Sequence, residues 1–359
     1  VMTDLGPKAR EMSKPEIRKD CMKYAGKYVK IQGKQFQDLG VFGNFEEPYL
    51  TFKPAYEAGI LEVFAELVGK GLVYKQLKPI HWCTGCETAL AEAELEYKDV
   101  SSPSIFVNFP ATDGAIQRLV ELGLVTAEQA KDSRVCFMIW TTTPWTLAAN
   151  LAVAVHPHLE YTTINYEKDG RKYVSVVAAE RVGAVVKAGG LGEDQYSVAP
   201  KTVKGSELDD LRYKHPFVEG NPTGKDAYMV ILAEYVTIED GTGLVHTAPG
   251  HGQEDYMAGQ MYGLAVYSPV KNDGRYDDTV PEWLRGKSVL NVEKDVNGWL
   301  QEHGWLFAQS QIQHSYPHRW RSRDPGVFRA TEQWFVGVDT AAPATSKPLR
   351  PMADASLYP

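Results

Sequence analysis

The sequence predicts a mixed α/β fold in which a β-barrel-like domain lies between two flanking segments. Two stretches with helical periodicity come first, and from about residue 101 short apolar runs alternate with turn residues. A length of 359 residues suits two or three lobes, and a hydrophobic content of 43% can supply their cores. We expect a flanking helical segment over 1–100, the barrel-like domain over 101–311, a return segment over 312–340 and a disordered Pro/Ala/Ser-rich tail over 341–359.

Two helices are predicted in the first flanking segment. The first is expected to begin at Ser13, which forms a capping-box pattern with Glu16, and Pro15 suits its first turn. Its apolar residues recur at helical spacing and predict a stripe packed in a core: Ile17, Cys21, Tyr24, Tyr28 and Ile31. The second helix is expected over 54–68, because glycines at 69 and 71 end its pattern.

The remaining elements are mostly short strands. A strand is expected over 72–82 and a short acidic helix or connection over 89–97. Within the barrel-like domain the predicted strands are 104–109, 135–140, 151–155, 161–166, 173–177, 229–238 and 244–247, with helices at 115–122 and 178–188. Residues 314–338 are expected to form one strand that returns to the flanking lobe.

The composition restricts the compartment and the partners. Four cysteines, only two of them close together, argue against a disulfide framework and for a reducing, cytoplasmic environment. No apolar run is long enough to span a membrane and no signal-peptide pattern is present, so no membrane partner is expected. The net charge of −8 disfavours nucleic acid, although a local basic field matters more than the total. Such a field, or merely a solvated basic face, is formed by Arg319, Arg321, Arg323 and Arg329.

Residues 241–256, Gly-Thr-Gly-Leu-Val-His-Thr-Ala-Pro-Gly-His-Gly-Gln-Glu-Asp-Tyr, form a glycine-rich loop that carries chemistry. It holds the imidazoles His246 and His251 and the adjacent carboxylates Glu254 and Asp255. Glycine lets a backbone approach a ligand closely, and these side chains can hold amines or activate water. Many such loops are only turns, so the loop by itself leaves a structural role equally open.

A second polar segment lies about a hundred residues upstream. Trp140-Thr-Thr-Thr-Pro-Trp-Thr146 follows a run that is apolar on both faces and so predicts a buried strand. Ordinary strand chemistry would explain the threonines. Pro144 argues against that explanation, because it cannot donate to a ladder and would end the strand where the hydroxyls are.

Together these segments resemble the editing module of isoleucyl-tRNA synthetase, a class I aminoacyl-tRNA synthetase. Three further segments resemble the same family in the same order: Gly-Val-Phe-Gly-Asn-Phe-Glu-Glu-Pro-Tyr-Leu-Thr at 40–51, Leu-Lys-Pro-Ile-His-Trp-Cys-Thr-Gly-Cys-Glu-Thr-Ala-Leu-Ala-Glu-Ala-Glu at 77–94, and the stretches 316–321 and 328–335. Valyl- and leucyl-tRNA synthetases carry related modules and are the alternative members. The resemblance implies an editing domain inserted into an incomplete Rossmann-type catalytic lobe.

The resemblance also implies an activity. The domain would hydrolyse valine mischarged on isoleucine tRNA, and valyl-adenylate as a further substrate, with the terminal adenosine and the valine or isoleucine moiety as the groups bound. The His-Ile-Gly-His and Lys-Met-Ser-Lys-Ser signatures that bind ATP are absent, so ATP is expected only in a full-length enzyme and this chain is expected to be a middle fragment that needs the remainder of the synthetase for aminoacylation.

The resemblance assigns roles to individual residues. Asp255 would grip the substrate ammonium, and His246 would line the amino-acid pocket, where its ring can reject isoleucine. The hydroxyls of Thr141, Thr142 and Thr143 are expected to orient water and the reacting oxygens. The other substrate-binding residues are expected to be Trp140, Thr146, Asn150 and His251, the last as a residue that shapes the loop.

A metal site is not expected. Cys83 and Cys86 are half of a zinc-type pattern, with His81 nearby, but Arg319 and Ser322 stand where many family members carry the second pair of ligands. His314 or His318 could only complete an improvised site. Neither a cofactor for editing nor a bound zinc ion is therefore expected.

Two alternatives to an editing enzyme remain at this stage. One is a catalytically idle tRNA-binding fragment whose basic ends hold the RNA. The other is a metal-dependent hydrolase built from His246, His251 and Asp255.

Overall fold

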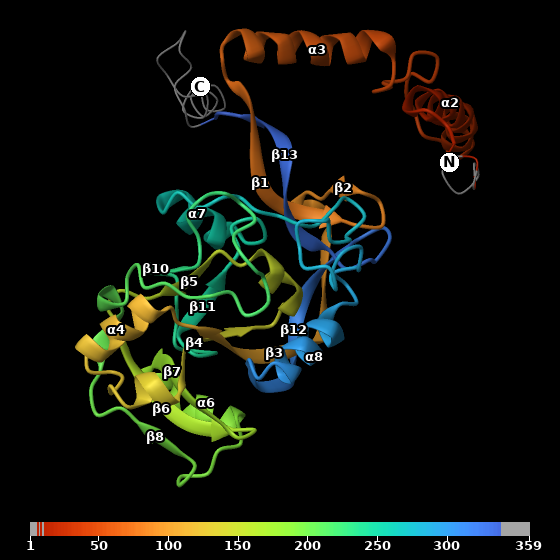
Figure 1. Ribbon diagram of the computed structural model, residues 1–359. Helices are drawn as coiled ribbons and strands as arrows, with labels where there is room; N and C mark the ends of the chain where they lie inside the picture. Colours follow the sequence, from red (N-terminus) through yellow and green to blue (C-terminus); the bar gives the residue numbers. More distant parts are fainter. Residues whose placement is uncertain (1–5, 7, 9–10, 339–359) are drawn as a thin grey trace. The chain divides into compact units, whose positions relative to one another are not determined.

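Short β-strands dominate the longer part of the chain, in keeping with its apolar and alternating runs. The computed structural model describes residues 6, 8 and 11–338, and the tail expected over 341–359 lies outside them. The described residues form two units, one from Gln76 to Gln333 and one made of the residues on either side (Figure 1). The expected mixed α/β class is confirmed.

The unit formed by the flanking residues contains the two expected helices, α2 (Lys14–Asp38) and α3 (Pro54–Gly69). The Ser13 backbone N–H donates to Glu16 Oε2 at 2.8 Å, and the Ser13 hydroxyl donates to the same oxygen at 2.7 Å. The Glu16 carboxylate thus satisfies the backbone N–H of the residue that precedes the helix, so the sequence pattern located the helix start correctly.

The expected burial of the α2 stripe is wrong. Neither α2 nor α3 contains a buried residue, and Tyr24, Tyr28 and Ile31 expose 38%, 37% and 40% of their surface. Periodicity identifies an apolar face but does not say which segment covers it. Within the described residues, no element covers this one.

A three-stranded sheet with the order β13-β1-β2 contains β1 (Val73–Cys83), β2 (Thr88–Ala89) and β13 (Val327–Val336). The single return strand expected over 314–338 is instead two strands, β12 (Leu306–Arg319) and β13, separated by a turn. Arg323 adopts a left-handed φ of 62° there, and Asp-Pro-Gly follows at 324–326. These are turn residues, and they account for the break between the two strands.

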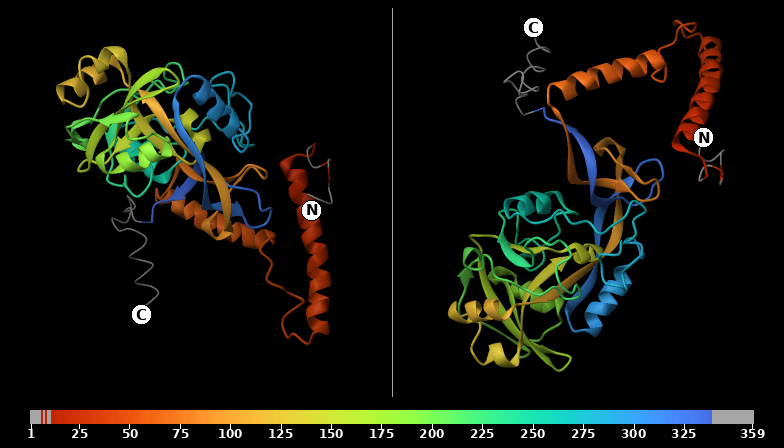
Figure 2. Two further views of the ribbon diagram at one scale, coloured as in Figure 1. Left: turned by 90° about the horizontal axis from the view of Figure 1, so that it is seen from below. Right: turned by 45° about the horizontal axis from the view of Figure 1, so that its top comes forward.

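The larger unit is built on a ten-stranded sheet that curls into a half-barrel (Figure 2). Its order is β10-β5-β11-β4-β7-β6-β8, with β3 on β4, β12 on β3 and β9 on β6. The strands are β3 (Leu95–Pro110), β4 (Arg134–Thr141), β5 (Ala152–Val155), β6 (Glu160–Lys168), β7 (Arg171–Ala178), β8 (Tyr196–Val198), β9 (Val203–Lys204), β10 (Met229–Leu232), β11 (Leu244–Thr247) and β12.

Strands β3 and β12 pair antiparallel from Val107 opposite Leu306 to Leu95 opposite Arg319. The first part of β3 replaces the helix or connection expected over 89–97, of which only a short 3-10 turn at Glu92–Glu94 remains. The boundaries expected at 101 and 311 both lie within this paired ribbon, and as domain boundaries they stay predictions. β10 ends at Leu232, earlier than expected, because only Met229–Leu232 finds a partner in β5.

Five helices accompany the sheet: α4 (Asp113–Glu121), α5 (Gln129–Asp132), α6 (Val182–Ala188), α7 (Gln253–Met261) and α8 (Glu293–Glu302). Helices α4 and α6 were predicted, whereas α5, α7 and α8 were not. α7 and α8 each contain a glycine and open with polar residues, which hides their helical periodicity. In the described part of the chain, none of the helices has the length and apolar content that crossing a bilayer requires.

The core of the larger unit is organised around β4. Its residues Val135 to Ile139 are at most 2% exposed, so both faces of this strand are covered, as its continuous apolar run predicted. A fully buried strand gives its end a fixed position, which matters because the threonine segment begins there.

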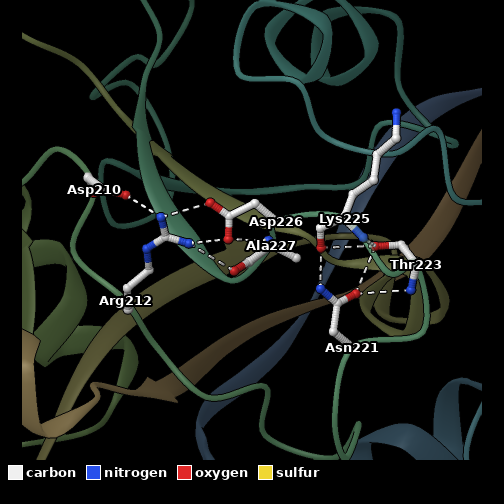
Figure 3. A network of polar contacts seen from close by, with 7 residues as sticks. All are labelled: Asp210, Arg212, Asn221, Thr223, Lys225, Asp226 and Ala227. Atoms are coloured by element: carbon white, nitrogen blue, oxygen red, sulfur yellow. Dashed lines mark hydrogen bonds and ion pairs between the residues drawn. The ribbon is translucent and has the colours of Figure 1, made fainter.

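A long irregular segment, residues 205–228, connects β9 to β10. Arg212 pairs with Asp210 and with Asp226 at 2.6 Å each, and Asn221, Thr223 and Lys225 close the neighbouring turn (Figure 3). The Arg212 hydrogen bond keeps the pKa of Asp226 below its usual value. Exposed ion pairs contribute about 1 kcal/mol or less, and these lie next to the buried Tyr213 in the same segment.

Candidate functional site

The two polar segments singled out in the sequence meet at one edge of the sheet. β4 and β11 are parallel neighbours, with Val245 opposite Trp140. The threonines that follow β4 and the loop that follows β11 therefore lie at the same end. Pro144 opens a 3-10 helix, Pro144–Ala149, so the strand stops where the hydroxyls begin, as predicted.

A cavity of about 230 Å³ lies where the segments meet. Eight of the predicted site residues line it: Trp140, Thr141, Thr142, Thr143, Thr146, His246, His251 and Asp255. The ninth, Asn150, is buried behind His246. One wall thus comes from the end of β4 and the other from the loop between β11 and α7.

The hydroxyl wall is partly ordered by its own hydrogen bonds. Thr143 Oγ1 lies 3.3 Å from Thr141 Oγ1 and 3.3 Å from Thr146 Oγ1, and the Thr143 N–H donates to Thr141 Oγ1 at 3.1 Å. Thr142 makes no hydrogen bond with any described residue, and its side chain is partly exposed. Hydroxyls both donate and accept, so this wall can bind a water and an ester oxygen together.

The protonation of His246 is set by its neighbours. Asn150 Nδ2 lies 3.1 Å from His246 Nδ1 and also donates to Ala152 O at 2.8 Å. An amide nitrogen only donates, so Nδ1 accepts and the ring proton is on Nε2. Nε2 therefore donates to Thr146 Oγ1 at 2.8 Å, and Thr146 passes its own hydrogen to Thr143 O at 2.9 Å.

A residue that the sequence analysis missed fixes this arrangement. The Tyr213 hydroxyl donates to Asn150 Oδ1, which determines which end of the amide faces His246. Tyr213 is only 2% exposed and lies in the irregular segment before β10. No motif signals it, because a lone tyrosine in a loop resembles any other core aromatic residue.

The His246 ring is neutral and rigidly held. Burial is the main reason that its pKa falls to about 3, and His215 and His251 lower the pKa further. With both ring nitrogens hydrogen-bonded, this side chain is unsuited to general-base catalysis at neutral pH. Its ring instead forms a stiff side of the cavity.

Asp255 is the acidic group of the opposite wall. It lies in the first turn of α7, and its Oδ2 accepts the Ala248 N–H at 2.8 Å. Burial nevertheless raises its pKa to about 7. No described cation pairs with Asp255, so a positively charged ligand group would restore the missing partner. Glu254 is exposed and does not line the cavity, as expected from its neighbouring position.

A close backbone approach positions this carboxylate. A Cβ added at Gly252 would lie 2.8 Å from Asp255 Cγ, so only glycine leaves the acid its present place. The position of the Asp255 carboxylate therefore requires a glycine at residue 252 of the loop.

His251 borders the cavity with an unused acceptor. Its Nδ1 donates to Phe328 O at 2.8 Å, and burial is the main reason that its pKa falls to about 4. Nε2 of this neutral ring is buried and finds no partner among the described residues. This neutral ring can therefore offer the cavity one hydrogen-bond acceptor, and its expected role in shaping the loop stays a prediction.

The described residues do not form a metal-ligand cluster. Both ring nitrogens of His246 are occupied, which opposes the arrangement a metal-dependent hydrolase would need. At the cysteine pair, Arg319 Nη1 donates to Cys86 Sγ, so a guanidinium stands where a third ligand would be required. The residues present do not fit zinc, and its expected absence stays a prediction.

Comparison with known proteins places the chain in a family. The family model described as "tRNA synthetases class I (I, L, M and V)" matches residues 2–356. An isoleucine–tRNA ligase of Petrotoga mobilis is 43% identical over 339 residues, which are 94% of this chain and 33% of that protein. An isoleucine–tRNA ligase of Geobacillus thermodenitrificans is 46% identical over 339 residues, 94% of this chain and 34% of that protein.

The chain thus spans about a third of the length of the curated relatives it matches. Among solved structures, the P. knowlesi cytosolic leucyl-tRNA synthetase editing domain superposes with a TM-score of 0.42 at 11% identity, covering 58% of this chain and 96% of that chain. A superposition this loose adds nothing to the assignment, which rests on the sequence matches. By these matches the chain belongs to the class I tRNA synthetases, and its relatives quoted above are isoleucine–tRNA ligases.

Proposed function

We propose that the cavity hydrolyses the ester that joins a wrongly attached valine to the terminal adenosine of isoleucine tRNA. The observation that carries this proposal is Asp255, a partly buried carboxylate that no described cation pairs with, which faces a wall of threonine hydroxyls across a small cavity. An aminoacyl ester carries a cationic amine next to a reactive carbonyl. The cavity offers a partner for each group.

In the proposed reaction Asp255 holds the α-ammonium of the substrate and thereby fixes the ester carbonyl against the hydroxyl wall. Thr142 and Thr143 donate to the carbonyl oxygen as it becomes an oxyanion. A water held by the same wall attacks the carbonyl carbon, and the ester C–O bond breaks. Valine leaves with the oxygen of the water, and the water's proton ends on the ribose hydroxyl.

Selectivity in this proposal comes from the His246 ring. One methylene separates isoleucine from valine and provides only about 1–3 kcal/mol of discrimination in an apolar pocket, an established magnitude for this synthetase family. A second site that excludes the larger side chain resolves this limit. His246 is fixed by Asn150 and Thr146, so its ring cannot swing away to admit the extra methylene.

The test compares hydrolysis of valyl- and isoleucyl-tRNA by the chain, its Asp255→Asn variant and its Glu254→Gln variant. The chain and Glu254→Gln should release valine much faster than isoleucine, and Asp255→Asn should lose at least about a hundredfold in kcat/KM. Binding of tRNA with no valine release would instead support the idle RNA-binding alternative. The reaction as proposed needs no cofactor, and ATP would serve only the remainder of the synthetase.

A further inference from the structure

Two turns of the larger unit lie against each other. One, residues 84–87, joins β1 to β2, and the other, residues 320–326, joins β12 to β13. A Cβ added at Gly85 would lie 2.9 Å from Asp324 Oδ2, so the backbone of the first turn approaches a side chain of the second closely. Segments more than two hundred residues apart in the sequence therefore meet here, and a glycine leaves them the space to do so.

The residue pattern of these turns is that of a zinc site with half of its ligands. Zinc sites of this kind take two thiolates from each of two turns, with two residues between the members of each pair. The first pair is present as Cys83 and Cys86, but the same spacing at the second turn holds Arg319 and Ser322. A guanidinium stays protonated and offers no lone pair, so Arg319 cannot bind a metal ion.

The Arg319 side chain reaches the sulfur atoms instead. Its Nη1 donates to Cys86 Sγ, and the buried Cys83 thiol is close enough to interact with the same guanidinium. Nε of Arg319 is buried and finds no partner among the described residues. The guanidinium thus lies at the cysteine pair, on the side from which the second turn would otherwise supply its ligands.

The backbone fixes the position of this arginine. The Arg319 N–H donates to Asp324 O at 2.9 Å, and the Arg319 carbonyl accepts the Arg323 N–H at 2.8 Å. Arg319 is therefore anchored in the second turn while its side chain contacts the first. A zinc ion would make the same connection, because it brings positive charge to the sulfurs and bonds that link both turns. The guanidinium charge also repels a metal ion at this short range.

We propose that Arg319 takes the place of a zinc ion in this chain. Its guanidinium holds the two turns together through Cys83 and Cys86, a contact we call the arginine clasp, and it excludes metal from the cysteine pair. The backbone keeps the arrangement on which a zinc site could be completed, and the side chains at 319 and 322 decide between clasp and metal. The inference is independent of the proposed function, since none of these residues lines the cavity beside Asp255.

The first experiment completes the set of ligands. Arg319→Cys/Ser322→Cys provides four thiols at the spacing of a zinc site, and Ser322→Cys alone adds a thiol but keeps the guanidinium. The full chain and both variants are produced with zinc in the medium, dialysed, and analysed for zinc by atomic emission. We expect about one zinc ion per chain in the double variant and no retained zinc in the other two. A strong chelator should lower the urea midpoint of the double variant alone.

The second experiment measures the clasp without any metal. The clasp fixes the turn that leads into β2, whose Thr88 pairs with Cys83. Arg319→Ala should therefore speed amide hydrogen exchange in β2 about tenfold or more, as for the loss of a hydrogen bond to a charged group. Arg321→Ala is the matched control, because Arg321 is exposed in the same turn and its guanidinium lies over the Trp320 ring. It should leave exchange in β2 unchanged.

Three results would overturn the inference. The first is an unaltered chain that retains zinc as the double variant does. The second is a folded double variant that binds no zinc, since the turns would then lack the arrangement of a zinc site. The third is equal exchange in β2 for Arg319→Ala and Arg321→Ala, which would mean that the guanidinium does not hold the turns. The third comparison decides the matter if the double variant does not fold.

Discussion

Thr146 Oγ1 and His246 Nε2 lie 2.8 Å apart, although the two residues are a hundred positions apart in the chain. The contact joins the 3-10 helix after β4 to strand β11, and it is part of a longer series that runs from Tyr213 through Asn150 to the Thr143 carbonyl. Every member donates to the next or accepts from it in a fixed sense. The ring of His246 is therefore positioned in part by Tyr213 and Asn150, which do not line the cavity.

Tyr213→Phe should reveal this positioning. The change removes only the hydroxyl, leaves Asn150 Oδ1 without its donor, and is expected to lower the free energy of unfolding by about 1–3 kcal/mol. The amide can then rotate, so we expect His246 to populate both tautomers and valine release to slow severalfold in kcat with little change in KM.

Nitrogen NMR shifts of the His246 ring, together with urea unfolding, check this prediction. Tyr228→Phe is the matched control, because no described residue hydrogen-bonds that hydroxyl and the change should leave the His246 ring shifts as they are. An unchanged tautomer in Tyr213→Phe would show that the tyrosine only fills space.

Asp255→Asn should raise stability while it removes activity. Burial raises the folded-state pKa of Asp255 to about 7, above the roughly 3.9 of an unfolded chain. The folded state thus binds more protons between these values, so the wild-type chain loses stability as the pH rises from about 4 to about 7. Three pKa units set an upper limit of about 4 kcal/mol.

Urea unfolding at pH 5 and pH 8 measures this effect. The stabilisation by Asp255→Asn should be clearly larger at pH 8. A variant that is less stable than the wild type at pH 8 would mean that Asp255 has a cationic partner in the free protein.

Substrate binding should show the opposite pH dependence to stability. Asp255 must be ionised to hold an ammonium, so KM for the valyl ester should rise about tenfold for each pH unit below 7. The pH profile of kcat/KM between pH 5 and pH 7 tests this. A flat profile would remove Asp255 as the group that binds the amine.

His246→Ala should relax the size filter. Truncating the ring leaves space beside the amino-acid side chain, so isoleucyl ester should become a substrate and the valine-to-isoleucine ratio of kcat/KM should fall at least tenfold. Side-by-side deacylation assays measure that ratio. The variant should also lose stability, because Asn150 and Thr146 lose a buried partner. An unchanged ratio in folded protein would place the filter elsewhere.

Gly252→Ala should displace Asp255 without unfolding the domain. The added methyl would lie 2.8 Å from Asp255 Cγ, so the carboxylate has to move and KM for the valyl ester should rise about tenfold. Gly298→Ala is the matched control, since its Cβ would meet nothing within 4 Å and α8 should gain up to about 1 kcal/mol. Equal activity of both variants would show that the loop adjusts freely.

The local elements could be read from the sequence because local interactions determine them. The Ser13–Glu16 cap fixed the start of α2, and the continuous apolar run before Thr141 marked β4 as buried on both faces. The motifs, taken in their order along the chain, also predicted that the acid, the imidazoles and the threonines belong to one site. Pro144 ends the strand and Gly252 allows a close backbone approach, and both effects follow from the residue type itself.

Only the tertiary structure decided what these elements contact. The face of α2 that carries Tyr24 and Tyr28 is exposed. Helical spacing could not predict this, because it identifies an apolar face but not the element that covers it. Tyr213 reaches Asn150 because folding brings an irregular segment beside the buried side of the site. Hydrogen-bond direction, desolvation and cavity size depend on atoms distant in the chain, so the tautomer of His246 and the raised pKa of Asp255 arise only when the strands have assembled into the sheet.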